Sequence, residues 1–218
     1  MCKVRVNTSI QCVAHAGSNT FLDCEISTKE VICAIKCQNW GNLRMMLQTS
    51  SAEDTINDNK DDDALILACK FGAPFDIIME LISIKPKLLR KWDARSGHTP
   101  LHIACRDDII TEDRASIISL MATQYSTAAV VKDLCGMTPL HLLCKTPCRS
   151  PEYVVAVHVL CKKGPLALMT ENEAGETPIE TFLMMQNCRS YEQEGYQKEV
   201  LSALHSSSAD YLRSCARG

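Results

Sequence analysis

The chain has 218 residues, of which 46% are hydrophobic, 22% are charged and 5% are aromatic, and its formal net charge is −3. This apolar content suffices for one sizeable core or for a stack of small units, and the low aromatic content disfavours an all-β sandwich. The charge argues against a general nucleic-acid-binding protein, and the lack of an apolar run of about 18 residues predicts that no helix spans a membrane. The first nine residues lack the apolar stretch of a signal peptide, so we expect none.

Thirteen residues are cysteines, an odd number. Secreted disulfide scaffolds are usually shorter than this chain and pair their cysteines. We therefore expect reduced thiols and an intracellular protein, located in the cytoplasm or the nucleus.

The sequence repeats itself at intervals of 34 to 39 residues. The clearest copies begin at Thr99 and Thr138, where Thr-Pro-Leu-His-Ile-Ala-Cys returns 39 positions later as Thr-Pro-Leu-His-Leu-Leu-Cys. A partial copy begins at Thr177 with Thr-Pro-Ile-Glu, and weaker echoes begin at Asp63 and Lys29. Each of the three threonines is preceded two positions earlier by a glycine. The motif residues are Thr99, Pro100, Leu101, His102, Thr138, Pro139, Leu140, His141, Thr177, Pro178, Gly97, Gly136 and Gly175.

These residue types predict a tight turn followed by a helix. The glycine suits a turn that would strain a larger residue. Each threonine can cap the first turn of a helix, and the proline after it stands at a position where no amide is needed. The helix then places a cysteine in the same slot of three copies, at Cys69, Cys105 and Cys144, and we expect these thiols to pack in the core.

The Thr-Pro-Leu-His motif with its preceding Asp-x-x-x-Gly or Asp-x-x-Gly resembles the ankyrin-repeat family. The resemblance implies an all-α fold, namely an ankyrin-type solenoid of about five helix-turn-helix repeats joined by short hairpin turns. It also implies stacking, because one unit is too small to bury its apolar face alone. The expected units are 29–57, 58–92, 93–132, 133–171 and 172–205. Residues 1–28 form either a disordered segment or a degenerate half-repeat, and 206–218 form a loose tail.

The resemblance further implies a non-catalytic module that binds a partner protein through its concave groove and its hairpin tips. We expect no cofactor and a monomer that binds neither nucleic acid nor membrane. The family's surface residues vary freely, so the fold does not name the partner.

One candidate binding surface is a column of cations at the ends of the first helices. It comprises Lys36, Lys70, Arg106 and Lys145, with Met184 in the fifth unit. Stacked helices lie about 10 Å apart, so such a ladder could hold an acidic extended segment. The rival interpretation is local, because a cation also stabilises the C-terminal end of its own helix.

The hairpin tips are the second candidate surface. They carry Trp92, Arg95, His98, Leu134 and Met137. Large apolar groups on exposed tips favour interfaces, but these side chains could equally pack against the next hairpin. The sequence leaves both possibilities open.

The competing functional class is a Cys/His zinc-binding protein or a thiol-dependent enzyme. His141 with Cys144 and His158 with Cys161 form an H-x2-C-x13-H-x2-C pattern, with Cys148 nearby. Zinc favours such ligand pairs. However, His141 and Cys144 already have structural positions in the repeat, and the sequence offers no third partner for a nucleophile. The acidic run 57–63 lacks the glycine of a calcium loop and is better explained as a solvated turn, where Asp63 caps the next helix.

Overall fold

The computed structural model describes residues 28–48, 64–106, 113–146, 151–187 and 194–217. Within these ranges the chain forms ten α-helices and three 3-10 helices, and no β-strand. The prediction of an all-α fold is therefore confirmed. The expectations for residues 1–27 and for the acidic run 57–63 lie outside the described residues.

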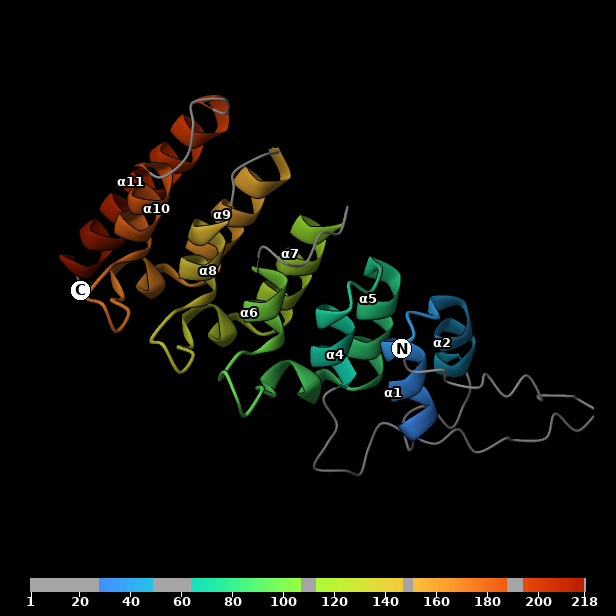
Figure 1. Ribbon diagram of the computed structural model, residues 1–218. Coiled ribbons are helices and arrows are strands. Elements are labelled where there is room, and N and C mark those ends of the chain that lie inside the picture. The colour runs from blue at the N-terminus through green and yellow to red at the C-terminus, as the bar shows by residue number, and fades with distance from the viewer. Residues whose placement is uncertain (1–27, 49–63, 107–112, 147–150, 188–193, 218) are drawn as a thin grey trace, which may run out of the picture.

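The α-helices form five consecutive pairs, and the pairs lie side by side in two rows (Figure 1). Neighbours within a row contact each other, and so do the two helices of each pair. The first row contains α1 (Thr28–Lys36), α4 (Ala64–Lys70), α6 (Pro100–Ala104), α8 (Pro139–Lys145) and α10 (Pro178–Asn187). The second row contains α2 (Trp40–Leu47), α5 (Phe75–Ile84), α7 (Arg114–Gln124), α9 (Pro151–Lys163) and α11 (Glu194–Cys215).

A single apolar core runs between the two rows along the whole array. Ile77, Ile118 and Val157 are fully buried on successive helices of the second row. The three cysteines predicted for the core, Cys69, Cys105 and Cys144, are all buried on the first row. A fully buried aliphatic side chain stabilises the fold by about 1.5–3 kcal/mol, so the stability of each pair depends on its neighbours covering both of its faces.

A short 3-10 helix follows each of α5, α7 and α9, and each buries two consecutive apolar residues. They are η1 (Pro86–Arg90), η2 (Ser126–Val130) and η3 (Pro165–Met169). The chain then leaves the helices as a hairpin loop that returns to the next helix of the first row. We name these loops A (91–98), B (131–137) and C (170–176). They project from one edge of the array (Figure 1).

The predicted glycine turns lie in these three loops. Gly97, Gly136 and Gly175 have φ values of 73°, 70° and 77°, in the left-handed region. In loop B the Asp133 carboxylate accepts hydrogen bonds from the amides of Cys135 and Met137, both 2.8 Å long. Asn172 closes loop C in the same way. Hydrogen bonds from the backbone to Asp133 and to Asn172 therefore hold the turns of loops B and C.

The prediction of a loose tail after residue 205 is wrong, because α11 continues without a break to Cys215. Val200, Leu204 and Ser208 are buried at intervals of four residues, and Tyr211 is half-buried one turn later. The helix therefore carries one continuous stripe that packs against α9. Three consecutive serines suggested a tail, but a serine is small enough to fill a position in that stripe.

Two glycine substitutions test how closely the loops pack. A Cβ atom at Gly136 would lie 2.9 Å from the backbone nitrogen of Glu173, whereas a Cβ at Gly175 would meet nothing within 4 Å. Both substitutions to alanine place a side chain at positive φ, which costs roughly 1–2 kcal/mol. Gly136→Ala should cost roughly 1–3 kcal/mol more, because it also pushes loop B away from loop C. Urea unfolding followed by circular dichroism measures both, and equal losses would contradict the packing.

Candidate functional site

The three hairpin loops contact one another directly through their backbones. The Leu134 amide of loop B donates to the Ser96 carbonyl of loop A at 3.1 Å. The Glu173 amide of loop C donates to the Cys135 carbonyl of loop B at 3.2 Å. The loops therefore form one continuous edge, called here the hairpin edge.

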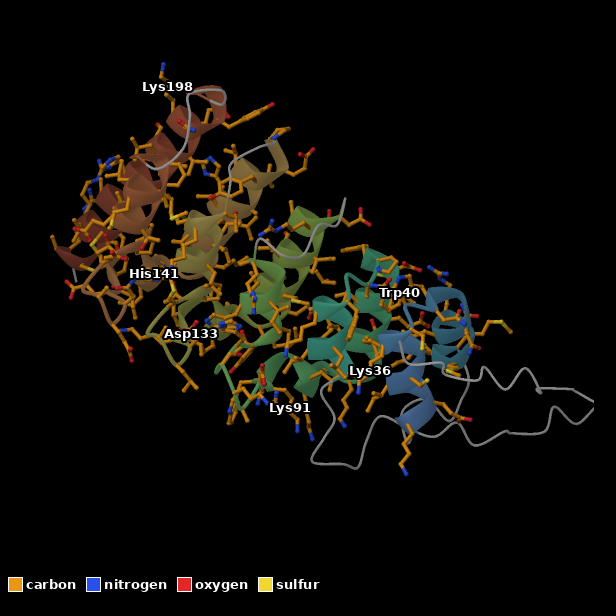
Figure 2. The ribbon with its side chains drawn as sticks, viewed as in Figure 1. Lys36, Trp40, Lys91, Asp133, His141 and Lys198 are labelled. Carbon is orange, nitrogen blue, oxygen red and sulfur yellow. The ribbon has the colours of Figure 1, made fainter. Side chains whose placement is uncertain are left out.

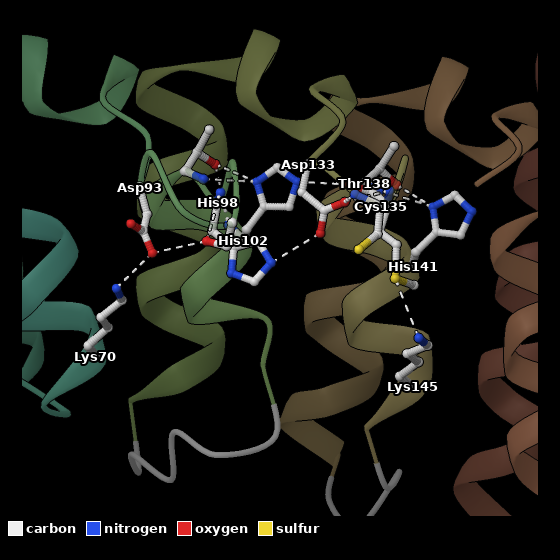
Figure 3. Close-up of polar contacts among 12 residues, drawn as sticks. Lys70, Asp93, His98, His102, Asp133, Cys135, Thr138, His141 and Lys145 are labelled. Carbon is white, nitrogen blue, oxygen red and sulfur yellow. Dashed lines mark hydrogen bonds and ion pairs between the residues drawn. The ribbon is translucent and has the colours of Figure 1, made fainter. Parts of the chain in front are cut away.

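In two copies of the repeat a buried histidine adds a second connection, from the first helix of one unit to the loop of the next (Figure 3). In α6 the Thr99 amide and hydroxyl lie 3.2 and 2.7 Å from His102 Nδ1. Because Nδ1 accepts the amide hydrogen, the ring proton is on Nε2, which donates to the Met137 carbonyl of loop B at 3.1 Å. The histidine thus caps its own helix and holds the next loop.

The second copy has the same geometry. His141 Nδ1 lies 3.1 Å from the Thr138 amide and 2.8 Å from its hydroxyl. Its Nε2 donates to the Glu176 carbonyl of loop C at 3.0 Å. The predicted caps at Thr99 and Thr138 are therefore confirmed, and the two histidines have structural positions.

The third copy replaces the histidine with Glu180, and the structure explains this departure. The Thr177 amide and hydroxyl both donate to Glu180 Oε2 at 2.7 Å. These bonds to the charged form lower the pKa of the Glu180 carboxyl. A carboxylate completes the capping box, but unlike a neutral imidazole it has no N–H with which to donate to the carbonyl of a further loop.

Burial sets the protonation of both bridging rings. Desolvation lowers the pKa of His102 from 6.5 to about 4 and outweighs the opposing hydrogen bond to Met137. Desolvation also lowers the pKa of His141. Both imidazoles are therefore neutral at physiological pH, and neither is poised to exchange a proton with a substrate.

Two of the predicted tip residues are part of the packing between loops. Met137 is only 5% exposed. The His98 side chain is 11% exposed, and its Nε2 lies 3.0 Å from Asp133 Oδ2 of loop B. Their prediction as partner-binding residues is wrong. The Met137 sulfur lies near Lys145 of α8, and His98 bonds to loop B, so neither side chain is free at the tip of its loop.

The other predicted tip residues lie on the surface. Trp92 and Leu134 are 64% and 62% exposed, on loops A and B respectively. Arg95 is also exposed, in the turn of loop A. Leu134 rests on loop A, where a Cβ added at Gly97 would come within 3.1 Å of its Cγ.

The predicted column of cations is not one uniform ladder. Lys70 Nζ lies 2.9 Å from Asp93 Oδ2 of loop A, and this bond lowers the pKa of Asp93. Lys145 Nζ lies 3.5 Å from the Met137 sulfur (Figure 3). Lys36 is exposed and Arg106 is half-buried at the end of the first-row helices. Lys70 and Lys145 thus contact the hairpin edge, although an exposed ion pair stabilises by only about 0–1 kcal/mol.

A different cluster of cations was missed by the sequence analysis. Between residues 85 and 95 there are five: Lys85, Lys87, Arg90, Lys91 and Arg95. Lys85 directly precedes η1, and the other four lie on η1 and loop A, at one end of the hairpin edge. The cluster is visible in the sequence as a local density of positive charge. It does not recur at the repeat interval, so a comparison of the units does not reveal it.

The Cys/His pattern does not converge on a site in the described residues, where no group of three or more His, Cys, Asp and Glu side chains could hold a metal ion. Both nitrogens of His141 are engaged, and Cys148 lies outside the described ranges. Burial raises the pKa of Cys69 and Cys105 to about 12, and that of Cys161 to about 11. These buried thiols therefore stay protonated and are poor nucleophiles.

Comparisons with known proteins add little about function. No protein-family model matches the chain, and no curated protein matches it. One similar solved structure is a predatory endopeptidase from Bdellovibrio bacteriovorus in complex with an immunity protein, with 14% identity and a TM-score of 0.41. The match covers 83% of this chain and 99% of that chain. Among the described residues, no helix is both long and apolar enough to cross a bilayer.

The bridging histidines predict a pH-dependent stability. Unfolded His102 takes up a proton near pH 6.5, whereas the folded ring does so only near pH 4. The contribution of His102 to the free energy of unfolding should therefore be fully present above pH 6.5, decline by about 3 kcal/mol as the pH falls to 4, and change no further below that. Urea unfolding at a series of pH values measures this decline. His102→Gln should remove the part of the decline that comes from His102. The matched change His205→Gln, at an exposed site, should leave the decline intact. An unchanged slope in His102→Gln would contradict the assignment.

Proposed function

We propose that this chain is an ankyrin-type solenoid of about five helix-turn-helix repeats that binds a partner protein without catalysing a reaction. Support comes from the Thr-Pro-Leu-His motifs, the five helix pairs and the positive-φ glycines in the loops. A stack of this kind offers a long surface built from many short elements.

The proposal rests on one observation: at the hairpin edge, polar groups are hydrogen-bonded within the array, whereas large apolar side chains are exposed. Polar groups at this edge are bonded within the array, since His102 of α6 bonds to the Met137 carbonyl of loop B and His141 of α8 bonds to the Glu176 carbonyl of loop C. Large apolar side chains of the same loops, Trp92 and Leu134, are left in solvent. Rigidly held apolar groups lose little entropy on binding, and tryptophan is among the residues enriched in interface hot spots.

The same bonds argue against catalysis. A general base needs a free nitrogen and a pKa near the working pH, and the two motif histidines have neither. The buried thiols are protonated. All cysteines of the described residues are free, and we propose a reducing compartment, either the cytoplasm or the nucleus.

Affinity capture tests the binding function. The intact chain is immobilised and exposed to cell lysate beside a tip variant, Trp92→Ser with Leu134→Ser. The control variant is Met79→Ser with Val155→Ser, which removes two exposed apolar groups from the second row of helices. Loss of hot-spot groups weakens binding by roughly tenfold or more, so a protein held by the intact chain should be lost with the tip variant and kept by the control.

Two outcomes would contradict the proposal. Capture of no protein by the folded intact chain would argue against a binding module. A protein lost with the control variant and retained by the tip variant would move the binding surface to the second row. Circular dichroism of all three proteins separates loss of binding from loss of fold.

A further inference from the structure

Positive charge is concentrated at one end of the hairpin edge. Five of the eleven residues from Lys85 to Arg95 are cationic, and Asp93 alone is acidic. Lys87, Arg90 and Arg95 are exposed, and Lys91 lies half-buried at the edge of the molecule (Figure 2). The chain as a whole is negative, so this density of cations is a local property of η1 and loop A.

The single carboxylate within this cluster is already neutralised. Asp93 accepts hydrogen bonds from Lys70 Nζ at 2.9 Å, from the Ser96 hydroxyl at 3.0 Å and from the Arg95 amide at 3.2 Å. It is held inside loop A and is mostly buried. It therefore gives the neighbouring surface little negative potential with which to cancel the cations.

Apolar surface accompanies the charge. Trp92 lies between Lys91 and Asp93 in the sequence and is 64% exposed. Leu134 contacts loop A through its backbone bond to Ser96 and through its side chain beside Gly97. The cations of loop A thus have a large apolar side chain in their own loop and a second one on the adjoining loop.

The other end of the hairpin edge has the opposite charge. Loop C and the start of α10 carry Glu171, Glu173, Glu176 and Glu180, and the sequence from 164 to 186 contains no lysine or arginine. An acidic ligand is therefore attracted toward loop A and repelled from loop C, which limits where it can lie along the edge.

We propose that η1, loop A and Leu134 form a docking site for an acidic peptide segment that carries apolar side chains. Lys87, Lys91 and Arg95 attract its carboxylates, and Trp92 and Leu134 receive its apolar groups. The inference rests on the proposed protein-binding function and adds the chemistry of the partner. A protein segment fits this site better than a nucleic acid does. A single-stranded nucleic acid stacks its bases on aromatic rings, but the second large side chain here, Leu134, is aliphatic. The acidic loop C also disfavours a phosphate backbone that continues along the edge.

Peptide binding tests this site with defined probes. The acidic probe is a short labelled peptide with two leucines four residues apart and glutamates at its other positions, and the opposite probe has lysines in place of the glutamates. Fluorescence anisotropy should show binding of the acidic probe alone, weakening as sodium chloride is raised. In a Trp40→Phe background Trp92 is the sole tryptophan, and its emission should shift to shorter wavelength on binding.

Charge reversal provides the matched comparison. Lys91→Glu with Arg95→Glu should weaken the acidic probe roughly tenfold or more. Lys162→Glu with Lys163→Glu makes the same change in net charge on α9 and should leave the affinity unaltered. Equal effects of the two pairs, or tighter binding of a single-stranded RNA oligonucleotide than of the peptide, would overturn the inference. Anisotropy needs no tryptophan variant, so the test stands if Trp40→Phe fails to fold.

The result also separates this inference from the binding function beneath it. A cellular partner that is lost with the Trp92 and Leu134 variant but retained by Lys91→Glu with Arg95→Glu would overturn the acidic ligand and leave the binding function standing. Failure of the intact chain to hold any partner, together with failure to bind the acidic probe, would overturn both.

Discussion

The arrangement of the hairpin loops depends on a neutral imidazole that bonds to two units at once. His102 accepts from Thr99 at the start of its own helix and donates to the Met137 carbonyl of the next loop. Only one tautomer can do both, and only while the ring is uncharged. In the two units that have this histidine, burial itself keeps the ring neutral by lowering its pKa. The same histidine therefore caps its own helix and joins that helix to the next unit.

These bonds also explain how the hairpin edge could serve as the proposed binding surface. Many polar groups of the loops are hydrogen-bonded, either to the backbone of a neighbouring loop, to Asp133 or to one of the two histidines. Gly136 brings loops B and C so close that even a methyl group would collide. The backbones of the loops are therefore held in place without a ligand. The solvent-exposed side chains of the loops take no part in the bonds that hold these backbones, so they can be polar or apolar without destabilising the fold. Trp92 and Leu134 occupy such positions.

Much of the frame could be predicted because its causes are local. A threonine cap, a proline at the first helical position and a positive-φ glycine act within one turn, so sequence spacing reveals them. Exposure in the loops could not be predicted, because Leu134 and Met137 lie three residues apart in loop B and differ only in what the neighbouring loops cover. The pairing of Lys70 with Asp93 joins residues 23 positions apart. The extent of α11 was missed since serine alone does not disclose whether a helix has a partner to pack against.

The spacing between units also constrains a ligand at the proposed docking site. Packed helices lie about 10 Å apart, and the loops that they carry repeat at a similar distance. An extended peptide advances about 3.3 Å per residue, so roughly three residues separate positions over loop A from positions over loop B. Side chains alternate between the two sides of an extended chain, so apolar residues two or four apart would face Trp92 and Leu134 together. Acidic residues near the first of these positions then lie over Lys91 and Arg95, and the glutamates of loop C disfavour extension of the acidic segment in that direction. The proposed site therefore constrains the register of an acidic ligand as well as its charge.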